Sequence, residues 1–319
     1  MFRQLVPTGA ALAAILIASG CSSSSGNSDD SDNNDASGNA SLEGKAADGY
    51  LAGARVCLDL NNNASCDDGE PTTTTSAGGG YTLEGVTQEQ IANSPIVVEI
   101  IVGETIDEDN PGETIDKTYT LTAPAGSAFV SPLTTMVQNE IKENGLSPDE
   151  AKASIQARLG TELDPTEDYV AGSDDGTSGE EFQRLHKVAQ VTRAVMQKNI
   201  ELVNTVVDET GVSQEDLTAL IVEQVLEALD DIQQAIETAG DGFNADGLAS
   251  SDELQGTRLD PSKVEEQLEE RRDRRAATAA NLAALLTDGD GLNFFEAFEE
   301  EGALMFGYGN VQADGEGVI

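Results

Sequence analysis

Residues 59–70 constrain the fold of this chain most strongly, because oxygen-bearing side chains recur there at a fixed spacing directly after a short β-prone run. They occupy positions 1, 3, 5, 7, 9 and 12 of a twelve-residue loop: Asp59, Asn61, Asn63, Ser65, Asp67 and Glu70. A calcium loop places its ligands in this register, and the twelfth residue closes the shell as a bidentate carboxylate. Ala64 departs from the pattern, since glycine usually makes the turn at position 6. The spacing predicts a calcium site; the alternative is a polar turn without an ion, because Asn and Asp favour turns.

Two cysteines bracket this loop, Cys57 before it and Cys66 inside it. On a strand, Cys57 and Asp59 project to the same side, so a loop that curls back over Asp59 brings Cys66 to Cys57. In an oxidising compartment a disulfide is the simplest reading of this pair. A metal-binding or catalytic thiol pair is the alternative, but nothing nearby resembles a soft-metal site.

The first twenty residues have the features of an export signal. Arg3 gives a basic start, Ala10–Ala18 form an apolar run too short to span a membrane, and small residues precede Cys21. A cleavage site followed at once by cysteine resembles the lipobox of bacterial lipoproteins, although Ala18 stands where leucine is commoner. The resemblance implies lipidation of Cys21, and Ser22 in place of aspartate implies the outer membrane. The alternative is an ordinary secretory signal with a chance cysteine.

Residues 21–40 are expected to form a lipidated, disordered tether. Residues 22–40 contain no large apolar side chain, so the segment cannot bury enough surface to offset its chain entropy. About twenty flexible residues have a root-mean-square reach of roughly 25 Å.

The charge of the chain argues against several partners. Its 59 acidic and 17 basic residues give a net charge of −42, which becomes −43 when the signal peptide takes Arg3 away. Such a field repels nucleic-acid phosphates and anionic lipid headgroups, and it attracts divalent cations. We therefore expect no nucleic-acid partner.

Residues 41–127 read as a small β-sandwich. Short β-prone runs alternate with turn clusters, at 42–47, 54–60, 72–75, 81–86, 95–103 and 117–122. The segment GKAADGYLAGARVCLDLNNNASCDDGEPTTTTSAGGGYTLEGV is similar to the calcium-binding B-type and carboxypeptidase-regulatory-like β-sandwich modules of bacterial surface proteins, over roughly residues 42–103. The resemblance implies a structural or adhesive module, with a hairpin turn at Gly78–Gly80. It assigns these residues to the ion: Asp59, Asn61, Asn63, Asp67 and Glu70.

Residues 128–301 read as a helical domain, which makes the predicted fold class α+β, and residues 302–319 as a Gly-rich tail. Ser131-Pro132 and a capping box at Ser147–Glu150 begin two helices that end at Gly145 and Gly160. Longer amphipathic helices are expected over 180–209, 213–239 and 261–287, and a short one over 294–301. The pattern 131–160 also resembles uncharacterised Gram-negative lipoproteins that carry the same sandwich.

Two further acidic loops are weaker calcium candidates. The first would use Asn244, Asp246, Ser250 and Glu253, and its alternative is an interhelical turn. The second, residues 288–296, resembles an EF-hand loop that lacks a residue. Both are also explained as turns that end helices.

The remaining candidates have structural interpretations. His186, the only histidine, is expected on a helix surface, because no Gly-x-Ser-x-Gly elbow or partner cysteine accompanies it. The basic cluster 269–275 is expected to pair with itself along a helix, as Glu270 and Arg274 are four residues apart, although contact with acidic segments elsewhere stays open.

The sequence as a whole indicates a non-enzymatic cell-envelope lipoprotein that acts as a calcium-stabilised binding or structural module. It would be held at the membrane by its lipid anchor and would have an envelope protein as its partner. The alternative is an accessory lipoprotein of an outer-membrane transport system, whose helical domain docks a transporter or holds a small apolar ligand.

Overall fold

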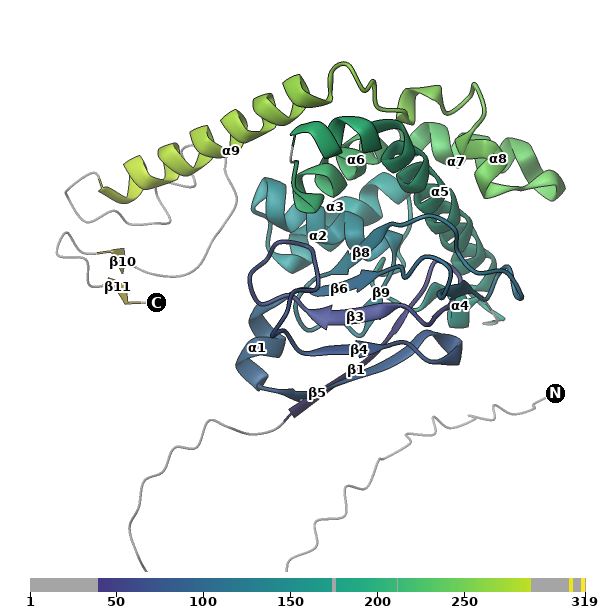
Figure 1. The fold of residues 1–319 in the computed structure, drawn as a ribbon, viewed down its shortest axis with the longest axis horizontal. Helices are drawn as coiled ribbons and strands as arrows, with labels where there is room; N and C mark the ends of the chain where they lie inside the picture. Colours follow the sequence, from purple (N-terminus) through teal and green to yellow (C-terminus); the bar gives the residue numbers. More distant parts are fainter. Residues whose placement is uncertain (1–39, 174–175, 211, 288–309, 312–316, 319) are drawn as a thin grey trace, which may run out of the picture. The chain divides into compact units, whose positions relative to one another are not determined.

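The computed structural model describes residues 40–173, 176–210, 212–287, 310–311 and 317–318, and it is a mixed α+β protein (Figure 1). Strands β1–β9 precede helices α2–α9 along the chain. The predicted signal peptide, Cys21, the tether before residue 40, the loop 288–296 and the helix 294–301 lie outside the described residues. Within the described part, no helix combines the length and apolarity that crossing a membrane requires.

Two sheets contain most of the strands. The three-stranded sheet has the order β5 (Gly80–Val86), β1 (Ala40–Ala46), β9 (Phe129–Val130). The four-stranded sheet has the order β4 (Thr72–Thr74), β3 (Arg55–Leu58), β6 (Ile96–Glu99), β8 (Thr120–Ala123). Two small antiparallel pairs join β2 (Leu51–Ala52) to β7 (Ile106–Asp107), and β10 (Asn310–Val311) to β11 (Gly317–Val318).

The glycine-rich turn does not make a hairpin. Strand β4 pairs with β3 in one sheet, whereas β5 pairs with β1 in the other. The turn at Gly78–Gly80, which includes a 3-10 turn at Ala77–Gly79, therefore carries the chain from one sheet to the other. A Cβ on Gly79 would lie 2.3 Å from the carbonyl oxygen of Ala46, so only glycine fits at this close approach.

Helix boundaries follow the predicted caps closely in the first helices. Helix α2 (Pro132–Asn144) begins after Ser131, whose side chain accepts a hydrogen bond from Thr134, and ends at Gly145 in the left-handed conformation. Helix α3 (Pro148–Leu159) has the predicted capping box and ends at Gly160. The other helices are α1 (Gln88–Asn93), α4 (Tyr169–Gly172), α5 (Gly179–Thr210) and α8 (Ala245–Ala249).

The helix expected over 213–239 is broken in two. Helix α6 (Gln214–Glu227) and helix α7 (Leu229–Ala239) meet at Ala228, whose φ of −100° and ψ of 13° interrupt the helical path. Helix α9 (Val264–Thr287) begins three residues later than Pro261, because the Asp260 carboxylate accepts bonds from Ser262 and forms a turn first.

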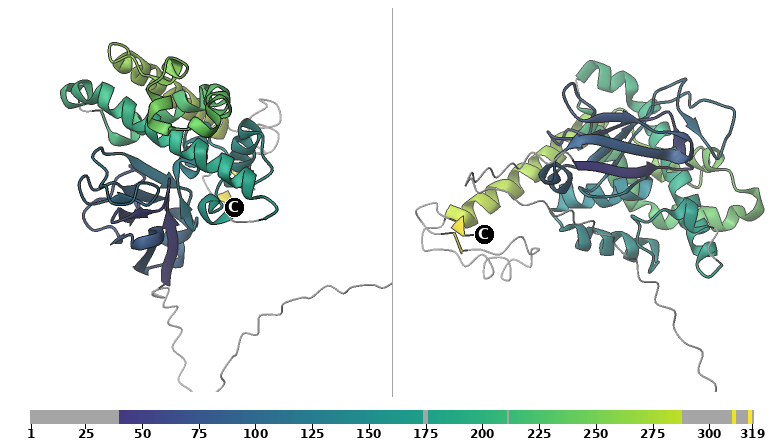
Figure 2. Two further views of the ribbon diagram at one scale, coloured as in Figure 1. Left: turned by 90° about the vertical axis from the view of Figure 1, so that its right-hand side faces the viewer. Right: turned by 90° about the horizontal axis from the view of Figure 1, so that it is seen from below.

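Strands and helices share their cores. One hydrophobic cluster combines strand residues such as Leu42 and Val98 with helix residues as distant as Leu268. The other lies mainly among α2, α3, α5, α6 and α7 and reaches the strands through Ala47 and Phe129. In Figure 2 the strands (purple to blue) and the helices (teal to green) accordingly lie side by side.

Candidate functional site

The predicted calcium loop begins at the buried end of strand β3. Asp59 is 1 % exposed, and its backbone N–H donates to the carbonyl of Pro95, so the first loop position is anchored beside β6. Cys57 and Cys66 form a disulfide, which confirms the predicted pairing. The backbone N–H of Cys66 also donates to Glu99 at 2.9 Å. The loop therefore starts and returns over the same sheet.

Backbone amides of the loop hold the two carboxylates at its ends. Asp59 accepts from the N–H of Asn63 at 3.1 Å and from that of Ala64 at 2.8 Å. Glu70 accepts from the N–H of Leu60 at 2.8 Å and from that of Asp67 at 3.0 Å. Positions 1 and 12 are thus fixed by the loop's own backbone, which is the preorganisation that a metal loop needs.

Ala64 adopts the conformation that glycine usually supplies. Its φ is 59°, in the left-handed region, and Asn62 has a φ of 61°. Asparagine tolerates this region, whereas a Cβ such as that of alanine makes it costly by roughly 1–2 kcal/mol. The sharp turn at loop position 6 is therefore present despite the departure in sequence.

The central side chains of the loop contact one another. The amide nitrogens of Asn61 and Asn63 each donate to Asp67 Oδ2 at 2.7 Å. Among the described residues, no group of three or more histidine, cysteine, aspartate or glutamate side chains could hold a metal ion. Half of the predicted ligand set is outside those residue types, however, because Asn61, Asn63 and Ser65 bring amide and hydroxyl oxygens. A half-turn of an asparagine amide exchanges its nitrogen for its oxygen, so this donor set fits a hard cation.

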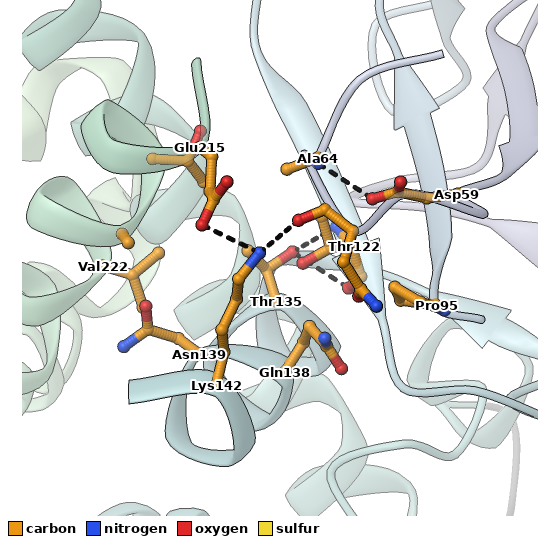
Figure 3. Close-up of a pocket in the computed structure, with 13 residues that line it drawn as sticks. Asp59, Ala64, Pro95, Thr122, Thr135, Gln138, Asn139, Lys142, Glu215 and Val222 are labelled. Atoms are coloured by element: carbon orange, nitrogen blue, oxygen red, sulfur yellow. Dashed lines mark hydrogen bonds and ion pairs between the residues drawn. The ribbon is translucent and has the colours of Figure 1, made fainter. Parts of the chain in front are cut away.

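One side of the loop lies against helices α2 and α6 (Figure 3). Lys142 of α2 donates to the carbonyl oxygen of Asn62 at 2.6 Å and forms an ion pair with Glu215 of α6 at 3.0 Å. The open hollow between them measures about 30 Å³, which suits a water molecule rather than an organic ligand. Lys142 is therefore a direct link between the loop and the helices.

A second polar junction, which the sequence analysis did not identify, surrounds Asp48. This carboxylate is fully buried, lies 2.9 Å from Nε of Arg193 on α5, and accepts from the Tyr119 hydroxyl at 3.1 Å. Arg193 also pairs with Asp246 of α8 at 2.8 Å. Burial raises the pKa of Asp48 to about 7, and nearby Asp107 adds to the rise, while Arg193 lowers it.

The sequence offered one signal for this junction. Arg193 is the one charged residue in the stretch Val191–Met196, which is otherwise apolar apart from Thr192, and the structure buries it. A buried arginine needs a buried acid, but the acid lies 145 residues away in sequence, in the turn after β1.

His186 is not a free surface residue. Its side chain is 17 % exposed, its Nε2 lies 2.8 Å from Asp109, and its ring lies 5.3 Å from that of Tyr169. Burial alone would raise the pKa of Asp109, but the hydrogen bond and charge of His186 outweigh it and lower that pKa. His186 thus joins α5 to the turn after β7.

The residues proposed for a second metal form a helix and the turn after it. Asn244 caps α8 by accepting from the N–H of Gly247, and Asp246 pairs with Arg193. Ser250 ends α8, and Glu253 is exposed. The segment is thus a short capped helix rather than the interhelical turn of the alternative interpretation, and Asp246 is engaged in an ion pair with Arg193.

Comparisons of this chain with protein-family models, with curated proteins and with solved structures found no match.

Proposed function

We propose that this protein is a non-enzymatic lipoprotein of the cell envelope, in which a calcium ion bound at residues 59–70 clamps a β-sandwich. The observation that carries the proposal is the fixing of Asp59 and Glu70 by amides of the same loop, around a left-handed Ala64. Both end carboxylates are held in place before any ion arrives. A cation can therefore bind these negative charges without the entropic cost of ordering the backbone.

Electrostatics support the same proposal. Four acids lie within twelve residues, at Asp59, Asp67, Asp68 and Glu70, and the only basic contact described for the loop backbone is Lys142. Like charges this close repel one another. A divalent cation relieves the repulsion, and since it binds the folded loop it stabilises the whole fold by mass action.

The wider architecture is part of the proposal. We infer a lipidated tether over 21–40, a β-sandwich over 41–127 and a helical domain over 128–301, at the outer membrane, with an envelope protein as partner. The order of strands before helices supports it, as does the burial of residues from both sheets in one cluster, which residues of α5, α6 and α9 complete. The disulfide supports an oxidising compartment.

Calcium binding is tested by thermal unfolding of the mature protein with calcium and with a chelator. We expect chelation to lower the melting temperature by several degrees, and Glu70→Gln to abolish the difference. Glu84→Gln, at an exposed position of β5, is the matched control and should behave as wild type. An identical melt with calcium and with chelator, together with no calcium in elemental analysis, would rule the site out.

The anchor is tested separately. Cys21→Ser should abolish incorporation of radiolabelled palmitate and release the protein from the membrane fraction, whereas Ser24→Ala should change neither. Membrane association of Cys21→Ser would contradict the lipid anchor without affecting the calcium proposal.

A further inference from the structure

The Cys57–Cys66 disulfide attaches the middle of the calcium loop to strand β3. Cys57 is fully buried in that strand, whereas Cys66 is partly exposed at loop position 8. Its neighbours Ser65 and Asp67 occupy positions 7 and 9 of the predicted ligand set. The crosslink therefore ties two ligand positions to the strand that ends just before Asp59, which provides position 1.

Other restraints on this part of the loop are few and exposed to water. Among the described residues, two hydrogen bonds join loop positions 2–8 to the rest of the protein. Lys142 donates to the carbonyl oxygen of Asn62, and Glu99 accepts from the N–H of Cys66. The side chains of Lys142 and Glu99 are both 28 % exposed, so water competes for both bonds. Without the disulfide, the loop would sample more conformations before an ion binds.

The freedom of an empty loop lowers its affinity for an ion. A calcium ion needs all its ligands in one arrangement, and the entropy lost in reaching that arrangement weakens binding. Rigidity is accordingly one of the properties that set the affinity of a calcium loop. The effect is reciprocal by linkage. If the disulfide raises calcium affinity by some factor, bound calcium raises the stability of the disulfide against reduction by the same factor.

We propose that the Cys57–Cys66 disulfide is a redox switch for the calcium site; this inference rests on the proposed function and adds its regulation. A dithiol reductant breaks the bond between the two Sγ atoms. It supplies two electrons and two protons, leaves Cys57 and Cys66 as thiols, and itself becomes a cyclic disulfide. The reduced loop binds calcium about tenfold more weakly than the oxidised loop, and bound calcium opposes reduction by the same factor.

The first measurement is calorimetric calcium titration of the mature chain with Cys21→Ser, which leaves the loop pair as its only cysteines. We expect this oxidised protein to bind calcium about tenfold more tightly than the same chain with Cys57→Ala and Cys66→Ala. Equal affinity of the two proteins would overturn the switch and leave the calcium site intact. Absence of calcium binding to the oxidised protein would instead refute the proposed function, and the switch with it.

The second measurement needs no variant of the loop cysteines. The chain with Cys21→Ser is equilibrated with mixtures of reduced and oxidised dithiothreitol, in chelator and at increasing calcium concentrations, and alkylation with mass spectrometry counts its free thiols. We expect calcium to raise the ratio of reduced to oxidised dithiothreitol at half-reduction by about tenfold and no further, because both redox forms are then saturated. Glu70→Gln should abolish this shift, and Glu84→Gln, at an exposed position of β5, should retain it.

Two results of this equilibration would overturn the switch. A midpoint that calcium leaves unchanged would show that the disulfide and the ion act independently. A midpoint that keeps rising in proportion to the calcium concentration would show that reduction unfolds the chain, since an unfolded form has no site to saturate. A plateau equal to the affinity ratio from the calorimetric titrations is the result that the switch requires.

Discussion

Lys142 Nζ donates to the carbonyl oxygen of Asn62 at 2.6 Å, across 80 residues of sequence. Asn62 is one of the two non-glycine residues with positive φ that the described residues contain, and both lie in the loop. A side chain on α2 therefore holds the most constrained part of the predicted calcium loop.

Replacing Lys142 with methionine should loosen this loop. The apolar stem is retained while the hydrogen bond and charge are lost, so we expect the free energy of unfolding to fall by about 1 kcal/mol. Amide hydrogen exchange at Asn63 and Ala64 should become faster. Lys152→Met, at a similarly exposed lysine on α3, is the control. Unchanged loop exchange in Lys142→Met would show that the contact does not restrain the loop.

Ala64→Gly should stabilise the protein. Glycine relieves the left-handed strain at φ 59°, but it also gives the unfolded chain more conformational freedom. We expect the free energy of unfolding to rise by about 0.5–1 kcal/mol in balance. Ala92→Gly, in helix α1, should instead cost about 1 kcal/mol. Urea unfolding measures both, and a loss of stability in Ala64→Gly would contradict the strain argument.

Removing the disulfide should lower the free energy of unfolding by more than Lys142→Met or Ala92→Gly does. The double variant Cys57→Ala and Cys66→Ala frees a loop with a sequence separation of 9, for which loop-closure entropy predicts a loss of about 2–3 kcal/mol. Urea unfolding in the presence of calcium measures this loss. A reducing agent should destabilise the wild type but not the double variant. Equal stability of the two proteins without reducing agent would mean that the crosslink does not restrict the unfolded chain.

Asp48 should make stability depend on pH. Its folded pKa of about 7 lies above the ordinary value of 3.8, so the folded state keeps a proton that the unfolded state has lost. This contribution is fully present below the ordinary pKa and is lost as pH rises toward 7.

Asp48→Asn should remove that dependence. The free energy of unfolding of wild type minus that of the variant should decrease between about pH 4 and about pH 7. Urea titrations at several pH values measure this difference. Thr82→Ala, at an exposed position of β5 that does not titrate, should show no such trend. A pH-independent difference for Asp48→Asn would place the pKa of Asp48 in its ordinary range.

Local signals in the sequence predicted local structure well. The caps at Ser131 and Ser147 and the glycines that end α2 and α3 act within a few residues, and all four are confirmed. The Cys57–Cys66 disulfide is equally local. The break at Ala228 had no such signal, because neither proline nor glycine marks it.

Contacts between distant segments could not be predicted in this way. The pairing of Arg193 with Asp48, and that of Arg271 with Glu143, each join residues more than a hundred positions apart. The sequence suggested that the basic cluster 269–275 pairs along its own helix, but Arg271, Arg272 and Arg274 pair with residues of α2 and α6. Glu143, Asp216 and Glu223 carry no distinguishing pattern, since the chain is rich in acids.

The hydrophobic cluster that runs from Leu42 to Leu268 has a consequence for biogenesis. A chain that emerges from its N-terminus delivers the strands first, yet their core is incomplete until helix α9 arrives. Contacts of such long sequence separation form late and slow folding. The newly delivered strands therefore present apolar surface for as long as the remaining helices take to follow, and during that interval they are prone to aggregate.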